Sequence, residues 1–201
     1  MPKAALIDYG VGNIFSMKNA LQKAGFTVEV TSNRKAISSA DAIVLPGVGA
    51  FGAVAKNIAG LKNVIVECVE RGVPLLGSCL GMQLLFDGSE EGAGEGLGII
   101  NGGVISFRGE LKTPHMGWNT IVTVRLNELM EGIEEDDYFY FVHSYYASPV
   151  DPNVVVAITG YGVNFPSVVS RDAVYGTQFH PEKSGKTGAV LLKNFSNIVG
   201  R

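Results

Sequence analysis

Short apolar runs in the first half of the chain constrain its fold more than any other feature. They occupy Ala4–Tyr9, Phe26–Val30, Ala42–Leu45 and Val73–Gly77, and three of them lead straight into glycine-rich turns. Such runs, apolar on both faces, are typical of strands that are buried on both sides. Their alternation with helix-like segments predicts an α/β fold, with a mostly parallel sheet covered by helices on both faces.

Helix-like segments separate these strands. In the first, Asn13 is placed to cap a helix and Gly25 to end it. Its apolar residues recur at the spacing of one helix face; they are Ile14, Met17, Leu21 and Ala24. Further helices are expected at Leu61–Glu70, Met82–Phe86 and Gly188–Val199.

The second half of the chain changes character. Its apolar segments are short, rich in β-branched and aromatic residues, and separated by Gly, Pro, Asn and Asp. This pattern predicts an antiparallel C-terminal addition to the sheet, or a small second sheet. The segments are Val104–Phe107, Trp118–Val124, Tyr138–Val142, Val154–Ile158, Val168–Ser170 and Val174–Phe179. No linker divides residues 1–201, so we expect a single domain.

Composition excludes several classes of protein. The net charge of −3 provides no basic surface for nucleic acid or an anionic membrane. No stretch approaches the roughly 20 apolar residues of a membrane span, and the opening residues do not resemble a signal peptide. Two cysteines do not make a disulfide framework, which favours a reducing, cytoplasmic compartment.

The sharpest local signal is Gly77-Ser78-Cys79-Leu80-Gly81, between a buried strand and a helix. A nucleophile in such a turn has strained backbone angles, and the flanking glycines let strand and helix approach closely. The helix N-terminus favours a thiolate at Cys79 and leaves the Leu80 N–H free for a developing oxyanion. The alternative is that Cys79 is a small core residue, which is our interpretation of Cys68.

A cysteine nucleophile needs a base, and the chain has three histidines. His180 follows the apolar segment Val174–Phe179, and Glu182 is close enough in sequence to orient its ring. His143 and His115 are competing bases, but neither is followed by an acid in the same register. We therefore favour His180 as the base, with the other two as parts of a binding wall.

The turn Pro46-Gly47-Val48-Gly49 also follows a parallel strand. Its backbone N–H groups can approach a substrate closely, so it is a candidate second half of an oxyanion hole. It lacks the pattern of a dinucleotide or phosphate-binding loop. No Cys/His cluster has the spacing of a metal site, and we expect neither metal nor cofactor.

These motifs, taken in order along the chain, resemble those of the triad-type (class I) glutamine amidotransferases. They are Pro46–Gly49, the run from Gly77 to Gln83, and Phe179-His180-Pro181-Glu182-Lys183-Ser184. The resemblance implies a flavodoxin-like three-layer sandwich. It also implies Cys79 as nucleophile, His180 as base and acid, and Glu182 as its orienting group. The implied oxyanion and substrate-binding residues are Gly47, Val48, Gly49, Leu80, Gln83, His143, Ser144 and Tyr145.

Within this family, three further segments resemble the branch formed by the glutaminase subunits of imidazole glycerol phosphate synthases. They are Asp8–Asn13, Pro114–Asn119 and Tyr138–Tyr145. The resemblance implies release of ammonia from glutamine, and its transfer to a (β/α)₈-barrel cyclase subunit in histidine biosynthesis. The expected interface residues are Asn13, His115, Trp118, Tyr138 and Lys183. The alternative for Trp118 and Tyr138 is ordinary core.

Three other functions remain open from the residues alone. The chain could serve another synthase, such as one that makes pyridoxal phosphate or anthranilate. It could be a cysteine peptidase or thiol esterase on a similar fold, or a regulatory subunit with a vestigial site. The intact set of Cys79, His180 and Glu182 argues against the last of these.

Overall fold

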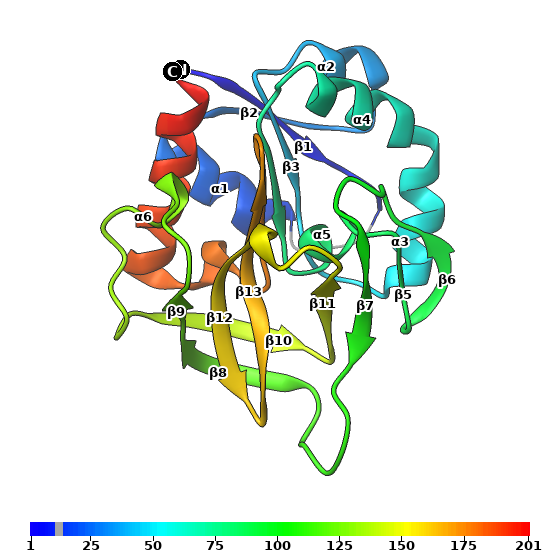
Figure 1. Cartoon of the computed structure of the whole chain (residues 1–201). Helices are drawn as coiled ribbons and strands as arrows, with labels where there is room; N and C mark the ends of the chain where they lie inside the picture. The colour runs from blue at the N-terminus through cyan, green and yellow to red at the C-terminus, as the bar shows by residue number, and fades with distance from the viewer. Residues whose placement is uncertain (11–13) are drawn as a thin grey trace.

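The computed structural model describes residues 1–10 and 14–201 (Figure 1). The predicted helix cap Asn13 lies outside the described residues. An eight-stranded sheet in the order β2-β1-β3-β4-β14-β13-β12-β9 forms the centre of the fold. The bounds of these strands are β1 Lys3–Ile7, β2 Thr27–Thr31, β3 Ala42–Leu45, β4 Leu75–Ser78, β9 Val122–Thr123, β12 Val155–Tyr161, β13 Val163–Arg171 and β14 Val174–Thr177.

The first five strands in this order, β2, β1, β3, β4 and β14, are parallel to one another. The remaining strands, β13, β12 and β9, extend the sheet in antiparallel fashion. The predicted α/β class is therefore confirmed, as is the antiparallel C-terminal addition. The parallel strands read as continuous apolar runs because both of their faces are buried. In β3, Ala42 and Val44 pack in one core, and Ile43 and Leu45 pack in the other.

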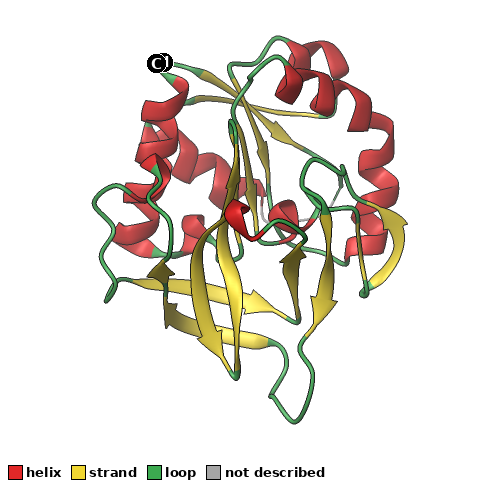
Figure 2. Cartoon of the chain, viewed as in Figure 1, coloured by secondary structure: helices red, strands yellow, loops and turns green. Residues whose placement is uncertain are grey.

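Helices cover both faces of this sheet, as Figure 2 shows in red. On one face, Met17 and Leu21 of α1 share a core with Leu192 and Phe195 of α6. On the other face lie α2, α3 and α4. The helix bounds are α1 Ile14–Ala24, α2 Arg34–Ser38, α3 Phe51–Ile58, α4 Lys62–Glu70, α5 Leu80–Gln83 and α6 Gly185–Val199, with short 3₁₀ turns η1 Ala59–Leu61, η2 Glu128–Met130, η3 Pro152–Val154 and η4 Pro181–Lys183.

Two helices escaped sequence analysis, and one was misplaced. The five residues of α2 are too few to show a periodic pattern, although Asn33 caps the helix through Lys35 N and Ala36 N. Helix α3 has no side-chain cap to mark its start. Helix α5 begins at Leu80 rather than at the predicted Met82, directly after the motif cysteine.

Two smaller sheets complete the fold. Strands β8 and β10 pair with each other, and β11, β7, β5 and β6 form a four-stranded sheet. The segment Trp118–Val124 was predicted as one strand, which is wrong, because it is divided between β8 and β9 in different sheets. The bounds are β5 Gly88–Ser89, β6 Gly92–Glu95, β7 Gly102–Ser106, β8 His115–Thr120, β10 Tyr138–His143 and β11 Tyr145–Pro149.

None of the helices in the described ranges combines the length and the apolar character required to cross a membrane.

Candidate active site

Neighbouring parallel strands bring the motif cysteine and histidine to one edge of the sheet. In the register of β4 with β14, Ser78 lies opposite Thr177. The Cys79 N–H donates to the Thr177 carbonyl over 2.6 Å, so the two chain segments stay paired as they leave the sheet. His180 follows three residues after Thr177. The carboxyl ends of parallel strands are where such sheets place their sites.

The turn at Cys79 has the strained geometry expected of a nucleophile. Its φ of 49° and ψ of −105° lie in a region that non-glycine residues rarely occupy. The flanking glycines are required by close packing. A Cβ on Gly77 would lie 2.4 Å from the Gly81 carbonyl oxygen, and one on Gly81 would lie 2.0 Å from that of Leu45. The strain therefore persists because the surrounding backbone holds the turn in place.

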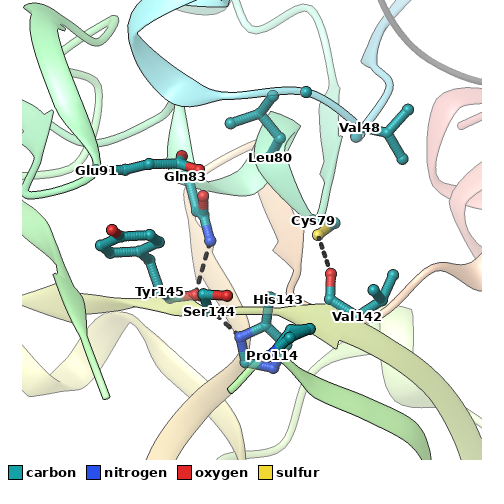
Figure 3. A pocket seen from close by; sticks show the side chains of 12 residues that line it. Val48, Cys79, Leu80, Gln83, Glu91, Pro114, Val142, His143, Ser144 and Tyr145 are labelled. Atoms are coloured by element: carbon teal, nitrogen blue, oxygen red, sulfur yellow. Dashed lines mark hydrogen bonds between the residues drawn. The ribbon is translucent and has the colours of Figure 1, made fainter. Parts of the chain in front are cut away.

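Cys79 lines a pocket but has little exposure of its own, since 6 % of the residue is accessible. Its thiol points to the Val142 carbonyl oxygen at 3.7 Å (Figure 3). The Gln178 side-chain amide donates to the sulfur at 3.6 Å. Sequence analysis missed both neighbours. Val142 belongs to an apolar strand and Gln178 lies at a strand end, and neither is part of a recognisable motif.

His180 is fully buried and oriented by Glu182. Its Nδ1–H donates to Glu182 Oε1 over 2.8 Å, and Ser78 Oγ donates to the other carboxylate oxygen at 3.4 Å. The second ring nitrogen, Nε2, is buried and has no hydrogen-bond partner among the described residues. The ring is therefore held in one orientation, with one nitrogen left for the cysteine proton.

Opposing effects set the pKa of His180. Burial lowers it, but the nearby Cys79 sulfur and the Glu182 carboxylate outweigh burial and raise the pKa to about 9. The ordinary pKa of histidine is about 6.5. The protonated ring therefore stabilises the fold fully below about pH 6.5, and this stabilisation is lost as the pH rises through about 9.

Replacement of Glu182 by glutamine is expected to lower the pKa of His180, because an amide keeps the shape of the side chain but removes the negative charge. An NMR titration of the His180 ring nitrogens measures this change. Lys183→Gln is the matched control, since it changes a charge on the same turn η4 without altering the acceptor at Nδ1. An unchanged pKa in Glu182→Gln would contradict the orienting role of Glu182.

A pocket of about 280 Å³ opens over Cys79. It includes every residue that sequence analysis predicted for the oxyanion hole and substrate binding. The structure adds Glu91, Pro114 and Val142 to that set. Glu91 lies between the short strands β5 and β6, where no local pattern marks it. The predicted residues in the lining are Gly47, Val48, Gly49, Leu80, Gln83, His143, Ser144 and Tyr145.

The Gly47–Gly49 turn packs directly against the nucleophile turn. A Cβ on Gly47 would lie 1.8 Å from the Ser78 carbonyl oxygen and 2.9 Å from Cys79 Cβ. Gly49 has a φ of 136°, which favours glycine. Leu80 is the first residue of α5, so its N–H has no acceptor within the helix. Backbone donors from both turns thus border the same pocket.

Comparison with known proteins decides the family. The model for the class-I glutamine amidotransferase family matches residues 5–198, which is nearly the whole chain. The chain belongs to the class-I glutamine amidotransferases. Solved structures agree on the fold, since a protein described only as a glutamine amidotransferase has a TM-score of 0.78 at 19% identity, over 98% of this chain and 99% of its own.

Among class-I glutamine amidotransferases, the chain is similar to proteins named imidazole glycerol phosphate synthase subunit HisH. The one from Methanocaldococcus jannaschii is 48% identical, over 96% of this chain and 98% of its own. The one from Pyrococcus furiosus is 46% identical, over 98% of this chain and 100% of its own. The structure of PurLQS from Thermotoga maritima has a TM-score of 0.77 at 18% identity, over 98% of each chain, and supports the fold alone.

The predicted interface residues of this amidotransferase differ in their exposure. Trp118 and Tyr138 are 56 % and 57 % exposed on the paired strands β8 and β10, so the core alternative for them is wrong. Lys183 Nζ lies 5.8 Å from the centre of the Tyr140 ring, and Tyr140 in turn contacts Trp118. His115 is only 4 % exposed, so its own side chain offers little surface to a partner. Asn13 lies outside the described residues.

The competing bases are also placed by the structure. His115 Nδ1 and His143 Nε2 lie 3.0 Å apart, and His143 Nδ1 contacts the Tyr145 carbonyl oxygen at 2.9 Å. Both nitrogens of His143 are therefore engaged. Burial is the main cause that lowers its pKa to about 3. A ring in this environment is a poor acceptor for the cysteine proton, which leaves His180 as the better candidate.

Proposed function

We propose that this chain is the glutaminase subunit of an imidazole glycerol phosphate synthase. It hydrolyses glutamine to glutamate and ammonia, and passes the ammonia to a cyclase subunit of histidine biosynthesis. The observation that carries the proposal is the interaction of Cys79, which lines the pocket, with a buried His180 ring held by Glu182. The similarity to HisH proteins over nearly the whole chain supports the choice of synthase.

At neutral pH the Cys79 proton already resides on Nε2 of His180, the ring nitrogen without another partner, because the pKa of His180 is raised to about 9. The sulfur then attacks the side-chain amide carbon of glutamine and forms a tetrahedral intermediate. His180 returns the proton to the amide nitrogen as the carbon–nitrogen bond breaks, and ammonia leaves. Water, activated by the same ring, hydrolyses the thioester and releases glutamate.

The pocket supplies groups that suit two parts of glutamine, the reacting amide and the α-ammonium group. Backbone N–H groups of the Gly47–Gly49 turn and of Leu80 are donors for the oxyanion, where the loss of one donor typically reduces kcat on the order of 10²–10³-fold. The Glu91 carboxylate borders the pocket and suits an α-ammonium group. It also accepts from the Phe51 N–H over 2.8 Å, which holds it in place. Gln83 lines the same wall and donates to the Tyr145 carbonyl oxygen at 2.9 Å.

Ammonia requires a shielded route, because in water at neutral pH it is mostly protonated and no longer a nucleophile. A partner docked over the site would provide one. The exposed rings of Trp118 and Tyr138 are suited to such a docking surface, since aromatic residues are enriched at interface centres. We propose a heterodimer with a (β/α)₈-barrel cyclase in the cytoplasm, where the two free cysteines stay reduced.

Purification with candidate synthase subunits tests the choice of partner. We expect the chain to co-purify with the cyclase, and to release glutamate faster when the cyclase and its ribonucleotide ligand are present. Equal rates with and without the cyclase would contradict the coupling. Co-purification with a pyridoxal phosphate or anthranilate synthase subunit would instead favour another branch of the family.

Trp118→Ala is expected to weaken binding of the cyclase about 30-fold, because truncation of a buried aromatic anchor typically costs about 2 kcal/mol. The dissociation constant by titration calorimetry measures this effect. Val150→Ala is the matched control, because Val150 is also exposed but lies outside β8 and β10. Equal affinities of the two variants would contradict the placement of the interface.

A further inference from the structure

Three polar side chains form a continuous hydrogen-bonded chain behind the glutamine pocket. Asn119 Nδ2 contacts His115 Nε2 at 3.3 Å, and His115 Nδ1 contacts His143 Nε2 at 3.0 Å. His143 Nδ1 contacts the Tyr145 carbonyl oxygen at 2.9 Å. The hydrogen-bonded chain therefore starts at Asn119 on strand β8 and ends at the Tyr145 carbonyl in the pocket wall. The mechanism described above uses none of its three side chains.

The direction of every hydrogen bond in this chain is determined at both ends. A carbonyl oxygen only accepts, so His143 Nδ1 carries a hydrogen and, in a neutral ring, Nε2 accepts. His115 Nδ1 must then donate to it, which leaves His115 Nε2 as an acceptor. At the other end, Asn119 presents its NH₂ group to that nitrogen. Both histidines are therefore Nδ1–H tautomers.

Backbone groups independently fix the amide of Asn119. Its Oδ1 accepts from the Thr120 N–H over 2.9 Å, and its Nδ2 also donates to the Gly160 carbonyl oxygen at 3.2 Å. An amide rotated by 180° would place an oxygen against the Gly160 oxygen and against His115 Nε2. The amide orientation therefore agrees with the proton order inferred from the Tyr145 end.

The surroundings keep both rings neutral. His115 stacks on the Tyr161 ring with centroids 4.1 Å apart, and the Phe141 and Phe165 rings pack against both histidines. His115 and His143 are 4 % and 6 % exposed. Burial lowers the pKa of His115, and lowers that of His143 to about 3. Protonation of either ring would also remove an acceptor that the chain requires.

We propose that Asn119 is a positioning residue that sets the tautomers of His115 and His143, and so holds the Tyr145 carbonyl in place as a wall of the glutamine pocket. The Tyr145 oxygen accepts from both His143 and Gln83, so it links the chain to a second pocket residue. The consequence for glutamine rests on the proposed function. Alternation along β8 explains the arrangement, because His115 and Asn119 lie on one side of the strand while Met116 and Trp118 are exposed on the other.

NMR of the ring nitrogens of His115 and His143 tests the proton order along the hydrogen-bonded chain without substrate. We expect both His115 and His143 to carry hydrogen on Nδ1 and none on Nε2 at neutral pH. A proton on Nε2 of either ring would overturn the proposal. Because this measurement does not require glutamine turnover, it is separate from failure of the proposed function, which would show as no glutamate release by the wild type.

Variants test the effect on glutamine. Asn119→Leu removes the donor, and we expect a mixture of tautomers at His143 and a KM for glutamine about tenfold higher, with a smaller change in kcat. Asn164→Leu is the control, since this exposed asparagine lies on β13, opposite Gly160 of β12, and is not a member of the hydrogen-bonded chain. His115→Gln keeps a donor for His143 and should preserve both readouts, whereas His115→Leu should not. A changed tautomer with an unchanged KM would overturn the positioning role.

Discussion

Replacement of Cys79 by alanine is expected to reduce glutamate release from glutamine by a factor on the order of 10⁴ or more, as for other nucleophiles that act as a unit with a base. Cys79 lines the pocket and supplies the sulfur that forms the thioester, and alanine leaves no nucleophile at this position. The rate of glutamate formation, with saturating glutamine and cyclase, measures the effect.

Cys68→Ala is the matched control for the loss of a thiol. Cys68 is also buried, but it lies on helix α4, away from the pocket residues. Its sulfur accepts from Arg71 Nη2 at 3.1 Å. This variant should retain glutaminase activity and lose only stability. A glutamine-like chloroketone should label the wild type and Cys68→Ala, but not Cys79→Ala. Full activity in Cys79→Ala would remove the nucleophile from the mechanism, and with it the proposed function.

Gly47→Ala is expected to lower the free energy of unfolding by about 3 kcal/mol, at the upper end of the usual range for overpacking. The new Cβ would lie 1.8 Å from the Ser78 carbonyl oxygen, which is a backbone atom in β4 and cannot rotate away. For a chain of this size, that loss corresponds to a thermal midpoint lower by roughly 6–12 °C. Differential scanning calorimetry measures this midpoint.

Gly60→Ala provides the comparison, because a Cβ at Gly60 would meet no atom within 4 Å. We expect its midpoint to stay close to that of the wild type. Gly47→Ala should also lose glutaminase activity at temperatures where it remains folded, since the clash displaces the turn that borders Cys79. Equal midpoints for the two variants would show that the two turns separate at little cost.

Much of the fold could be predicted from local patterns. Strand β3 was predicted with the bounds that the structure has, and the apolar face of α1 is the buried face. Such elements are predictable because their residues face the core at a fixed period. The divided strand at Trp118–Val124 was not, because a change of sheet depends on pairing with segments far along the chain.

The candidate site likewise contains residues that the sequence predicts and residues that it does not. The turns at Gly47 and Cys79 and the pair of His180 and Glu182 are visible in sequence, because each is a short motif at a strand end. Their meeting follows from a general rule, since the carboxyl ends of parallel strands share one edge of the sheet. Glu91 and Gln178 carry no such motif, so only the folded chain assigns them to the pocket or to the sulfur.

The sequence by itself therefore determined the class of fold and located the candidate nucleophile, base and acid, because local periodicity and strand-end motifs are properties of neighbouring residues. Only the tertiary structure decided that His115 is buried against His143, while Met116 and Trp118 on the same strand are exposed. The physical reason is register. Which side chains of β8 face inward depends on its pairing with β10, and that pairing joins residues too distant in sequence for any local pattern to specify.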